Sequence, residues 1–160
     1  MIDRISTGFK REIAVHGEGM AVDKEVNHKG YVEIDLRVRY AETDQMGVAY
    51  YGSYVVWFEV GRSEYCRAKG FSYGELEGMG FRLVVVDLRC RYKGSVKYDE
   101  LIVVRTHLKD LKTRMVTFGY RILRKDTQEV IVYGETRHLC LNKRGNPSSM
   151  PEKFLNRLKS

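Results

Sequence analysis

One long helical segment followed by four strand-like stretches most limits what this chain can fold into. Apolar and small residues recur at helical spacing from Tyr54 to Lys69, and Gly70 supplies a C-terminal stop. The β-like stretches follow at 81–92, 100–110, 114–124 and 130–142, with no further long helix among them. The helix must therefore bury its apolar face against a sheet made of several strands.

A fifth strand is predicted ahead of the helix. Over 31–40 apolar and charged residues alternate, the apolar set being Val32, Ile34, Leu36, Val38 and Tyr40. Short polar connections at 93–97, 110–113 and 125–129 predict antiparallel hairpins between successive strands. We therefore expect an α+β domain over 31–160, in which a curved antiparallel sheet of about five strands wraps round one long buried helix.

The remaining segments are short. Residues 72–79 predict a second short helix or turn, and Pro151 is expected at the first position of a short C-terminal helix. Residues 1–30 show no sustained period, so we interpret them as an extension outside the core, with a short helix near 7–15.

Composition favours a folded, cytoplasmic protein of one domain. The chain has 160 residues, of which 43% are apolar and 31% charged, and no apolar run approaches the length of about 20 residues that crosses a bilayer. The first residues carry charges where a signal peptide needs an apolar stretch. Three cysteines without close spacing, Cys66, Cys90 and Cys140, predict reduced thiols and neither a disulfide framework nor a metal site. We expect no cofactor.

The segment between the first strand and the helix carries the residues best suited to chemistry. Gly47 and Gly52 permit a tight loop, which places Asp44 just ahead of the helix N-terminus. Unpaired backbone N–H groups and the positive end of the helix dipole lie there. A carboxylate beside them could attack a carbonyl or activate water while the helix end stabilises the oxyanion. The spacing alone favours the simpler interpretation, in which Asp44 only caps the turn.

The same segment contains a spaced set of tyrosines around a Thr-Asp pair and a glycine, namely Tyr40, Thr43, Asp44, Gly47, Val48, Tyr50 and Tyr54. This pattern resembles the signature of the 4-hydroxybenzoyl-CoA thioesterase family and of the acyl-CoA thioesterases found with the bacterial Tol–Pal system, both hot-dog proteins. The resemblance extends over about 31–155. It implies a hot-dog fold and hydrolysis of a small or medium acyl-CoA, aliphatic or aromatic, to the free acid and CoA.

The resemblance also implies roles for single residues. It makes Asp44 the nucleophile or general base and the Tyr51 backbone N–H the oxyanion donor. It implies substrate contacts for Gly47, Val48, Tyr50 and Tyr54. Tyr51 stands where many Tol–Pal-type relatives carry histidine, which puts a histidine-assisted mechanism in doubt. The family's Y-x-x-P loop is replaced by Tyr92-Lys93-Gly94-Ser95, which removes a rigidifying proline near the expected CoA entrance.

The formal net charge of +7 predicts basic side chains that bind the phosphates of CoA. Residues 1–30 carry five basic and five acidic residues, so the whole excess lies in 31–160. CoA carries a pyrophosphate and a ribose phosphate, which favour a rim of Lys and Arg. The candidates by position are Arg91, Lys93, Arg124 and Lys125. The C-terminal basic cluster over 143–159 is interpreted as a solvated face.

Three alternatives compete with this assignment. Other hot-dog thioesterases use a glutamate on the central helix, for which Glu59 and Glu64 are the candidates, although a structural Glu59–Arg62 ion pair is the simpler interpretation. A non-catalytic acyl-CoA or acyl-carrier-protein binding module is the second alternative. A nucleic-acid binder is suggested only by charge and lacks the usual motifs. His107 and His138 lie in strands, away from any Ser-His-Asp arrangement.

Self-association is expected as well. A curved open sheet leaves edge strands, and pairing them across a two-fold axis removes that exposure. The resemblance implies a homodimer or tetramer with active sites at the interface.

Overall fold

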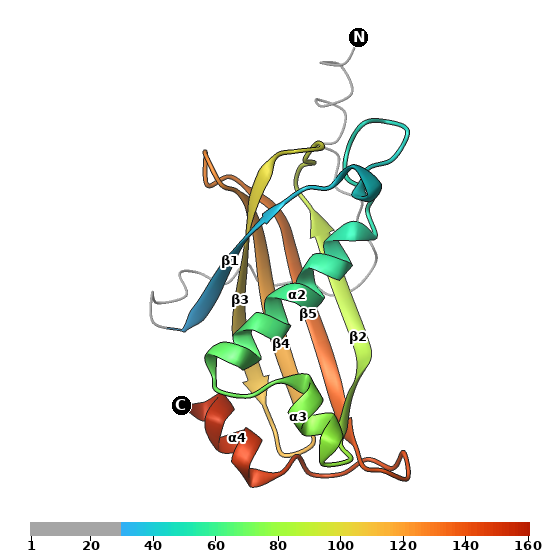
Figure 1. Cartoon of the computed structure of the whole chain (residues 1–160), viewed down its shortest axis with the longest axis vertical. Helices are drawn as coiled ribbons and strands as arrows, with labels where there is room; N and C mark the ends of the chain where they lie inside the picture. The colour runs from blue at the N-terminus through green and yellow to red at the C-terminus, as the bar shows by residue number, and fades with distance from the viewer. Residues whose placement is uncertain (1–29) are drawn as a thin grey trace.

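A computed structural model describes residues 30–160, and it confirms the α+β architecture predicted from the sequence (Figure 1). Its elements in chain order are β1 (Tyr31–Arg37), a 3-10 turn η1 (Tyr40–Glu42), α2 (Ser53–Ala68), α3 (Tyr73–Gly78), β2 (Arg82–Tyr92), β3 (Leu101–Leu111), β4 (Met115–Arg124), β5 (Val130–Leu141) and α4 (Glu152–Lys159). The five strands form one sheet in the order β1-β3-β4-β5-β2, and every neighbouring pair is antiparallel.

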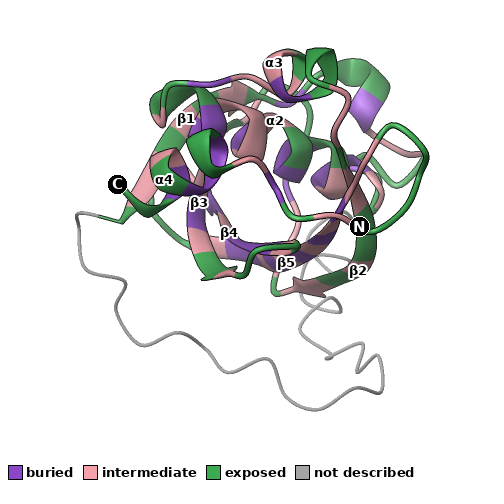
Figure 2. Cartoon of the chain, turned by 90° about the horizontal axis from the view of Figure 1, so that it is seen from below, coloured by how far each residue is buried: buried purple, intermediate pink, exposed green. Residues whose placement is uncertain are grey.

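The sheet curves round α2, so the main core lies between the helix and the concave face (Figures 1 and 2). Phe58 of α2 stacks on Tyr120 of β4 with ring centroids 4.5 Å apart. Close approach requires glycine at two places. A Cβ atom at Gly134 would collide with the Phe58 ring, and one at Gly61 would collide with Thr106 and Val104. These glycines let α2 lie directly on the strands.

Most predicted helices and strands begin and end within one or two residues of their predicted bounds. The helix predicted up to Lys69 is α2, and Gly70 follows it with a φ of +86°, the left-handed conformation that ends helices. The short helix predicted at 72–79 is α3, whose cap Ser72 accepts a hydrogen bond from the Glu75 N–H. The C-terminal helix begins at Glu152, so Pro151 lies one residue before its predicted place.

The first strand is shorter than predicted. It ends at Arg37, and Tyr40, which was expected to face the core, is 79% exposed. The chain turns here because the Glu42 carboxylate accepts a hydrogen bond from the Arg39 N–H at 2.8 Å, closing the 3-10 turn.

The hairpin predicted between 81–92 and 100–110 is wrong. β2 lies at one edge of the sheet beside β5, whereas β3 lies between β1 and β4. The connection over 93–100 therefore carries the chain past two strands, and Val96 within it is fully buried. A short polar segment does not by itself indicate which strand its neighbour will pair with.

The predicted extension over 1–30 and its short helix near 7–15 lie, apart from residue 30, outside the described residues. Within residues 30–160, none of the helices combines the length and the apolar character needed to span a bilayer.

Candidate active site

The loop that carries Asp44 is a tight turn closed by its own backbone. The Asp44 N–H donates to the Val48 carbonyl at 2.9 Å, and the Gly47 N–H donates to the Asp44 carbonyl at 3.0 Å. Gly47 has a φ of +77°, which explains why this position needs glycine. Thr43 and Ala49 form an isolated antiparallel bridge at the base of the turn. The loop is therefore held rigidly where the chain approaches α2.

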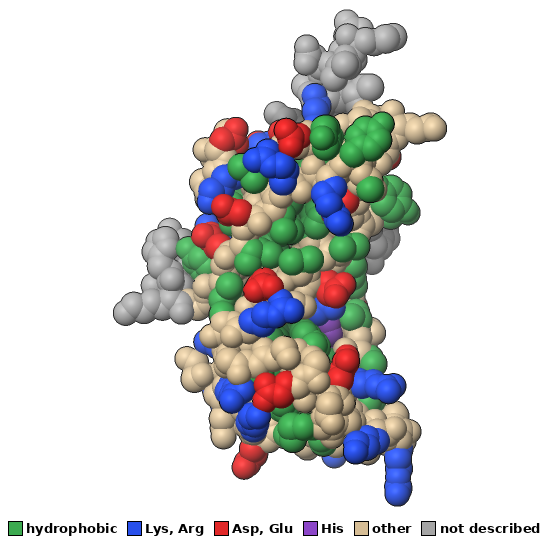
Figure 3. Space-filling view, in the orientation of Figure 1, with side chains coloured by type: hydrophobic (Ala, Val, Ile, Leu, Met, Phe, Trp, Pro, Cys, Tyr) green, Lys and Arg blue, Asp and Glu red, His purple; other side chains and the backbone are tan. Residues whose placement is uncertain are grey.

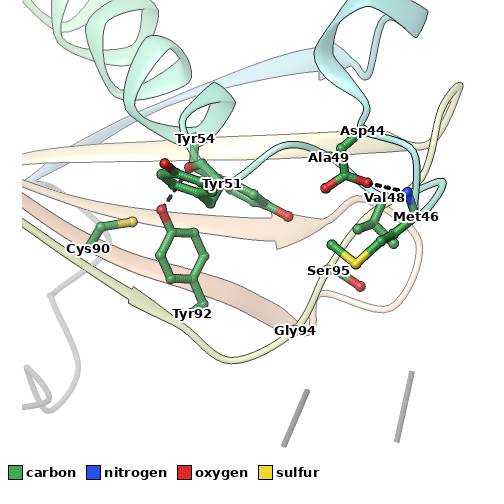
Figure 4. A pocket seen from close by; sticks show the side chains of 10 residues that line it. All are labelled: Asp44, Met46, Val48, Ala49, Tyr51, Tyr54, Cys90, Tyr92, Gly94 and Ser95. Carbon is green, nitrogen blue, oxygen red and sulfur yellow. Dashed lines mark hydrogen bonds between the residues drawn. The ribbon is translucent and has the colours of Figure 1, made fainter. Parts of the chain in front are cut away.

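Asp44 uses one carboxylate oxygen in this turn and leaves the other unengaged. Its Oδ1 accepts a hydrogen bond from the Met46 N–H at 2.8 Å, whereas Oδ2 has no hydrogen-bond partner among residues 30–160. Asp44 also lies on the wall of a pocket of about 250 Å³ (Figure 4). The residue is thus a turn cap and a pocket residue at once.

The pocket lies between this loop, the start of α2 and the end of β2. Most of its wall is apolar or aromatic, and the lining residues are Asp44, Met46, Val48, Ala49, Tyr51, Tyr54, Cys90, Tyr92, Gly94 and Ser95. Such a cavity suits an apolar group held beside a single carboxylate.

The start of α2 is fixed by the backbone of Glu42. The Tyr50 N–H donates to the Glu42 carbonyl at 2.8 Å, and the Ser53 hydroxyl donates to the same carbonyl at 3.0 Å. The Ser53 N–H in turn holds the Tyr50 carbonyl at 2.9 Å. Because the peptide is planar, this last bond also orients the Tyr51 N–H. Among the described residues, the Tyr51 N–H has no hydrogen-bond acceptor.

The Glu42 side chain also links the turn at Arg39 to α2, a role that the sequence analysis did not predict. Its carboxylate accepts hydrogen bonds from the Arg39 guanidinium at 2.8 Å and from the indole N–H of Trp57 at 3.0 Å. Burial acts to raise the pKa of Glu42, but the bonds from Arg39 and Trp57 outweigh it, so the pKa lies below its ordinary value. The Arg39–Glu42 spacing was the available signal, since an acid three residues after a turn's first residue is a capping pattern.

Three aromatic side chains shape the inner wall of the pocket. Tyr54 is only 2% exposed, and its ring meets the Tyr92 ring edge to face with centroids 5.4 Å apart. The Tyr92 hydroxyl donates to the Tyr51 carbonyl at 2.7 Å. Burial raises the pKa of Tyr54 to about 12 and that of Cys90 to about 11, so both remain protonated near neutral pH.

Comparison with known proteins decides the family. Residues 46–131 match the family described as Thioesterase superfamily. This chain belongs to the thioesterase superfamily. The match covers more than half of the chain and begins two residues after Asp44, so it does not bear on the role of that residue.

Individual relatives agree with this assignment. YneP of Bacillus subtilis, provisionally named an acyl-CoA thioesterase, is 38% identical over 109 residues, which are 68% of this chain and 78% of YneP. A solved DHNA-CoA thioesterase from Staphylococcus aureus is 34% identical, with a TM-score of 0.74 over 79% of this chain and 85% of its own. The hypothetical protein TT1821 from Thermus thermophilus is 32% identical, with a TM-score of 0.76 over 81% and 95%. The chain is a thioester hydrolase with the hot-dog fold.

Only some of the predicted substrate residues of this thioesterase line the pocket. Val48 and Tyr54 line the pocket, whereas Gly47 and Tyr50 are not among its lining residues. Tyr50 instead packs against Tyr51, with ring centroids 4.3 Å apart. The sequence pattern did not single out Met46, Ala49 or Cys90. Cys90 reaches the pocket from β2, far along the chain, whereas Met46 and Ala49 lie in the same loop as Asp44 and could have been named from the sequence.

The basic candidates differ in what they contact. Arg124 donates to Glu100 at 2.5 Å, to Glu129 at 3.2 Å and to the Ser95 carbonyl. Lys125 pairs with Asp35 at 3.0 Å. Lys93, next to the pocket residues Tyr92 and Gly94, is exposed and has no ion-pair partner among residues 30–160. Basic and acidic side chains are interspersed on the face seen in Figure 3.

The alternative acids lie away from the pocket. Glu59 is exposed and Glu64 pairs with Arg67, and neither is among the pocket residues. The expected Glu59–Arg62 ion pair does not occur among the described residues. Arg62 is half-buried, and its guanidinium lies 5.9 Å from the centre of the Tyr73 ring.

The strand histidines lie apart from Asp44 in the fold as in the sequence. His138 is fully buried and shares a 2.8 Å hydrogen bond with Thr136. Within residues 30–160, His, Cys, Asp and Glu side chains do not gather in any group of three that could hold a metal ion.

Proposed function

We propose that this thioesterase hydrolyses small or medium acyl-CoA thioesters, with Asp44 as the catalytic carboxylate. The observation that carries the proposal is the Oδ2 atom of Asp44, which has no partner in the described part of the chain and lies on the wall of an apolar pocket beside the start of α2. The names of relatives such as YneP support CoA as the thiol component. The mostly apolar and aromatic wall of the pocket suits an aliphatic or aromatic acyl group.

The chemistry follows from this arrangement. As a nucleophile, Asp44 would attack the thioester carbonyl, form a mixed anhydride and expel CoA as its thiolate; water would then release the free acid. As a general base, it would take a proton from the water that attacks the same carbonyl. On either route negative charge develops on the carbonyl oxygen. The Tyr51 N–H, which has no acceptor among residues 30–160, is the proposed donor to that oxygen.

The test is hydrolysis by the purified full chain of a panel of acyl-CoA thioesters, followed through release of the free thiol. We expect Asp44→Asn to retain the fold and to lose at least about a hundredfold in kcat, the scale of acid–base or nucleophilic catalysis. Near-normal turnover by this variant would overturn the role assigned to Asp44.

Asp126→Asn is the matched control. Asp126 also accepts a backbone hydrogen bond, from the Thr127 N–H at 2.7 Å, but it lies in the β4–β5 turn and not on the pocket. Its replacement removes the same charge from a similar turn, so we expect unchanged turnover.

We also propose that the chain self-associates through β2, an edge strand of the sheet. Val85, Val86 and Leu88 are exposed on this strand. Pairing of two β2 strands would cover these side chains and satisfy the edge backbone groups. It would also bring a second chain close to the pocket, because Cys90 and Tyr92 belong to the same strand.

A further inference from the structure

The Tyr51 carbonyl lies just outside the hydrogen-bond ladder of α2. The neighbouring carbonyls are used locally: Tyr50 accepts from the Ser53 N–H at 2.9 Å, and Gly52 accepts from the Val55 N–H at 3.1 Å. The Tyr51 carbonyl receives its only hydrogen bond among the described residues from the Tyr92 hydroxyl, 2.7 Å away. One side chain from the edge of the sheet therefore holds the peptide between Tyr51 and Gly52.

Tyr92 is well placed to hold that peptide because its own position is fixed. It pairs with Val132 of β5 at the end of β2, and the next two residues both donate backbone hydrogen bonds to the Ile131 carbonyl. Its ring meets the buried Tyr54 ring edge to face (Figure 4). The hydroxyl thus connects the sheet to the start of α2 across the pocket.

The consequence for catalysis is electrostatic. A carbonyl oxygen carries partial negative charge, and one turned toward the thioester would oppose the charge that develops there. Because the peptide is planar and trans, holding the Tyr51 carbonyl also fixes the opposite direction for the Gly52 N–H. A carbonyl that already accepts a hydrogen bond is both neutralised and prevented from rotating.

We propose that Tyr92 is a positioning residue for thioester cleavage, which acts by holding the Tyr51 carbonyl so that the amides at the start of α2 remain available to the substrate oxygen. This inference rests on the proposed function of the pocket. Tyr92 does not exchange protons with the substrate in this role, because burial, first, and then its neighbour Cys90 raise its pKa well above the ordinary value.

The test is Tyr92→Phe, which removes the hydroxyl and keeps the ring. We expect kcat to fall roughly tenfold, the scale of one lost hydrogen bond, while KM for the same acyl-CoA changes less than about threefold. A variant that lost only stability would keep the wild-type kcat in its folded fraction, and this result would overturn the inference.

Tyr133→Phe is the matched control. Tyr133 pairs with Arg91, the residue before Tyr92, and its ring lies 5.9 Å from the Arg121 guanidinium, outside the pocket. We expect its replacement to leave both kcat and KM unchanged. An equal loss of kcat in both variants would show that the effect is not specific to the Tyr51 contact and would overturn the inference.

A second measurement separates this inference from the proposed function. We expect Tyr92→Phe to speed amide hydrogen exchange at residues 51–53 without changing it in the middle of α2. Unchanged exchange at 51–53 would contradict the positioning role even in an active enzyme. If the wild-type chain cleaved no acyl-CoA while exchange at 51–53 still rose, the proposed function would fail and the structural link would stand.

Discussion

At the scale of single residues, the fold keeps two buried side chains deprotonated, one of them charged and the other neutral. Glu42 stays ionised because Arg39 and Trp57 donate hydrogen bonds to its carboxylate. His138 stays neutral: burial, first, and the charge of Arg62, second, lower its pKa from the ordinary 6.5 to about 4. Both groups are deprotonated near neutral pH. Lowering the pH would protonate them and so destabilise the folded state.

The pH dependence of His138 follows from the sign of its shift. The unfolded chain takes up a proton at this histidine below about pH 6.5, whereas the folded chain resists doing so until about pH 4. Unfolding therefore becomes progressively more favourable between these values, by roughly 3 kcal/mol in all. We expect the free energy of unfolding of His138→Gln, measured with urea at about pH 7 and about pH 4.5, to depend less on pH than that of the wild type.

Comparison of the two proteins isolates the histidine. Carboxyl groups whose pKa is lowered in the folded state, such as Glu42 and Glu75, also lose stabilisation as the pH falls. They are present in both proteins and cancel in the difference. An identical pH dependence in the variant would show that His138 is protonated equally easily in the two states.

At the scale of helices and strands, local pattern predicted the elements well and their pairing less well. Period-two alternation and glycine stops located β1 and α2 because these signals are local. The predicted pairing of β2 was wrong because hairpin formation depends on tertiary contacts, here the burial of Val96 within the connection. The turn at Arg39 was missed although its closing bond, from the Arg39 N–H to Glu42, is local; only the further contact of Glu42 with Trp57, fifteen residues away, depends on the fold.

The candidate site, too, was predicted where its residues are neighbours in sequence and missed where they are not. The Asp44–Gly47 turn and the start of α2 are contiguous in sequence, so a sequence pattern could bring them together. Cys90 and Tyr92 reach the pocket from β2, 41 residues beyond Tyr51 in the case of Tyr92, and only the fold places them there. The basic residues near the pocket could be enumerated from the sequence, but their ion-pair partners could not.

The connection between β2 and β3 provides a prediction about CoA. Lys93 lies beside the pocket without an ion-pair partner among residues 30–160, so we expect it to contact a CoA phosphate. Lys93→Ala should raise KM for acyl-CoA by about three- to tenfold and leave kcat unchanged, with a smaller effect at high salt. Lys112→Ala, in the β3–β4 turn at the other end of β3, is the control and should change neither constant.

Arg124 has a different place in the same region. Its contacts with Glu100, Glu129 and the Ser95 carbonyl hold the connection against the sheet, which leaves its guanidinium engaged.

An equal rise in KM on replacing either Lys93 or Lys112 would show a general effect of charge and would contradict a specific contact at Lys93.

At the scale of the whole molecule, the two edges of the sheet differ in chemistry. The β1 edge carries charged side chains that are paired across the sheet, including Glu33 with Arg105 and Asp35 with Lys125. Charged edge strands resist pairing with another sheet. The β2 edge also carries the exposed Arg82 and Arg89, but in addition it exposes Val85, Val86 and Leu88 beside a bulge between Val85 and Asp87. If two copies associate through an edge, β2 is therefore the favoured one.

Leu88→Asp tests this assembly. An aspartate at this position would place two like charges at a two-fold interface, where they cannot be solvated as in the free chain. We expect light scattering coupled to size-exclusion chromatography to give a multiple of 18.6 kDa for the wild type and a monomer for the variant. Because β2 also supplies pocket residues, turnover should fall with dissociation.

Leu101→Asp separates the interface from a general effect of surface charge. Leu101 is 39% exposed and Leu88 is 40% exposed, but Leu101 begins β3, which is hydrogen-bonded on both sides by β1 and β4. Its replacement introduces the same charge at a similarly exposed leucine and should leave the mass in solution unchanged. Dissociation by both variants alike would show a general effect of surface charge and would contradict β2 as the pairing edge. A wild-type monomer would exclude the assembly altogether, and the pocket would then have to function within a single chain.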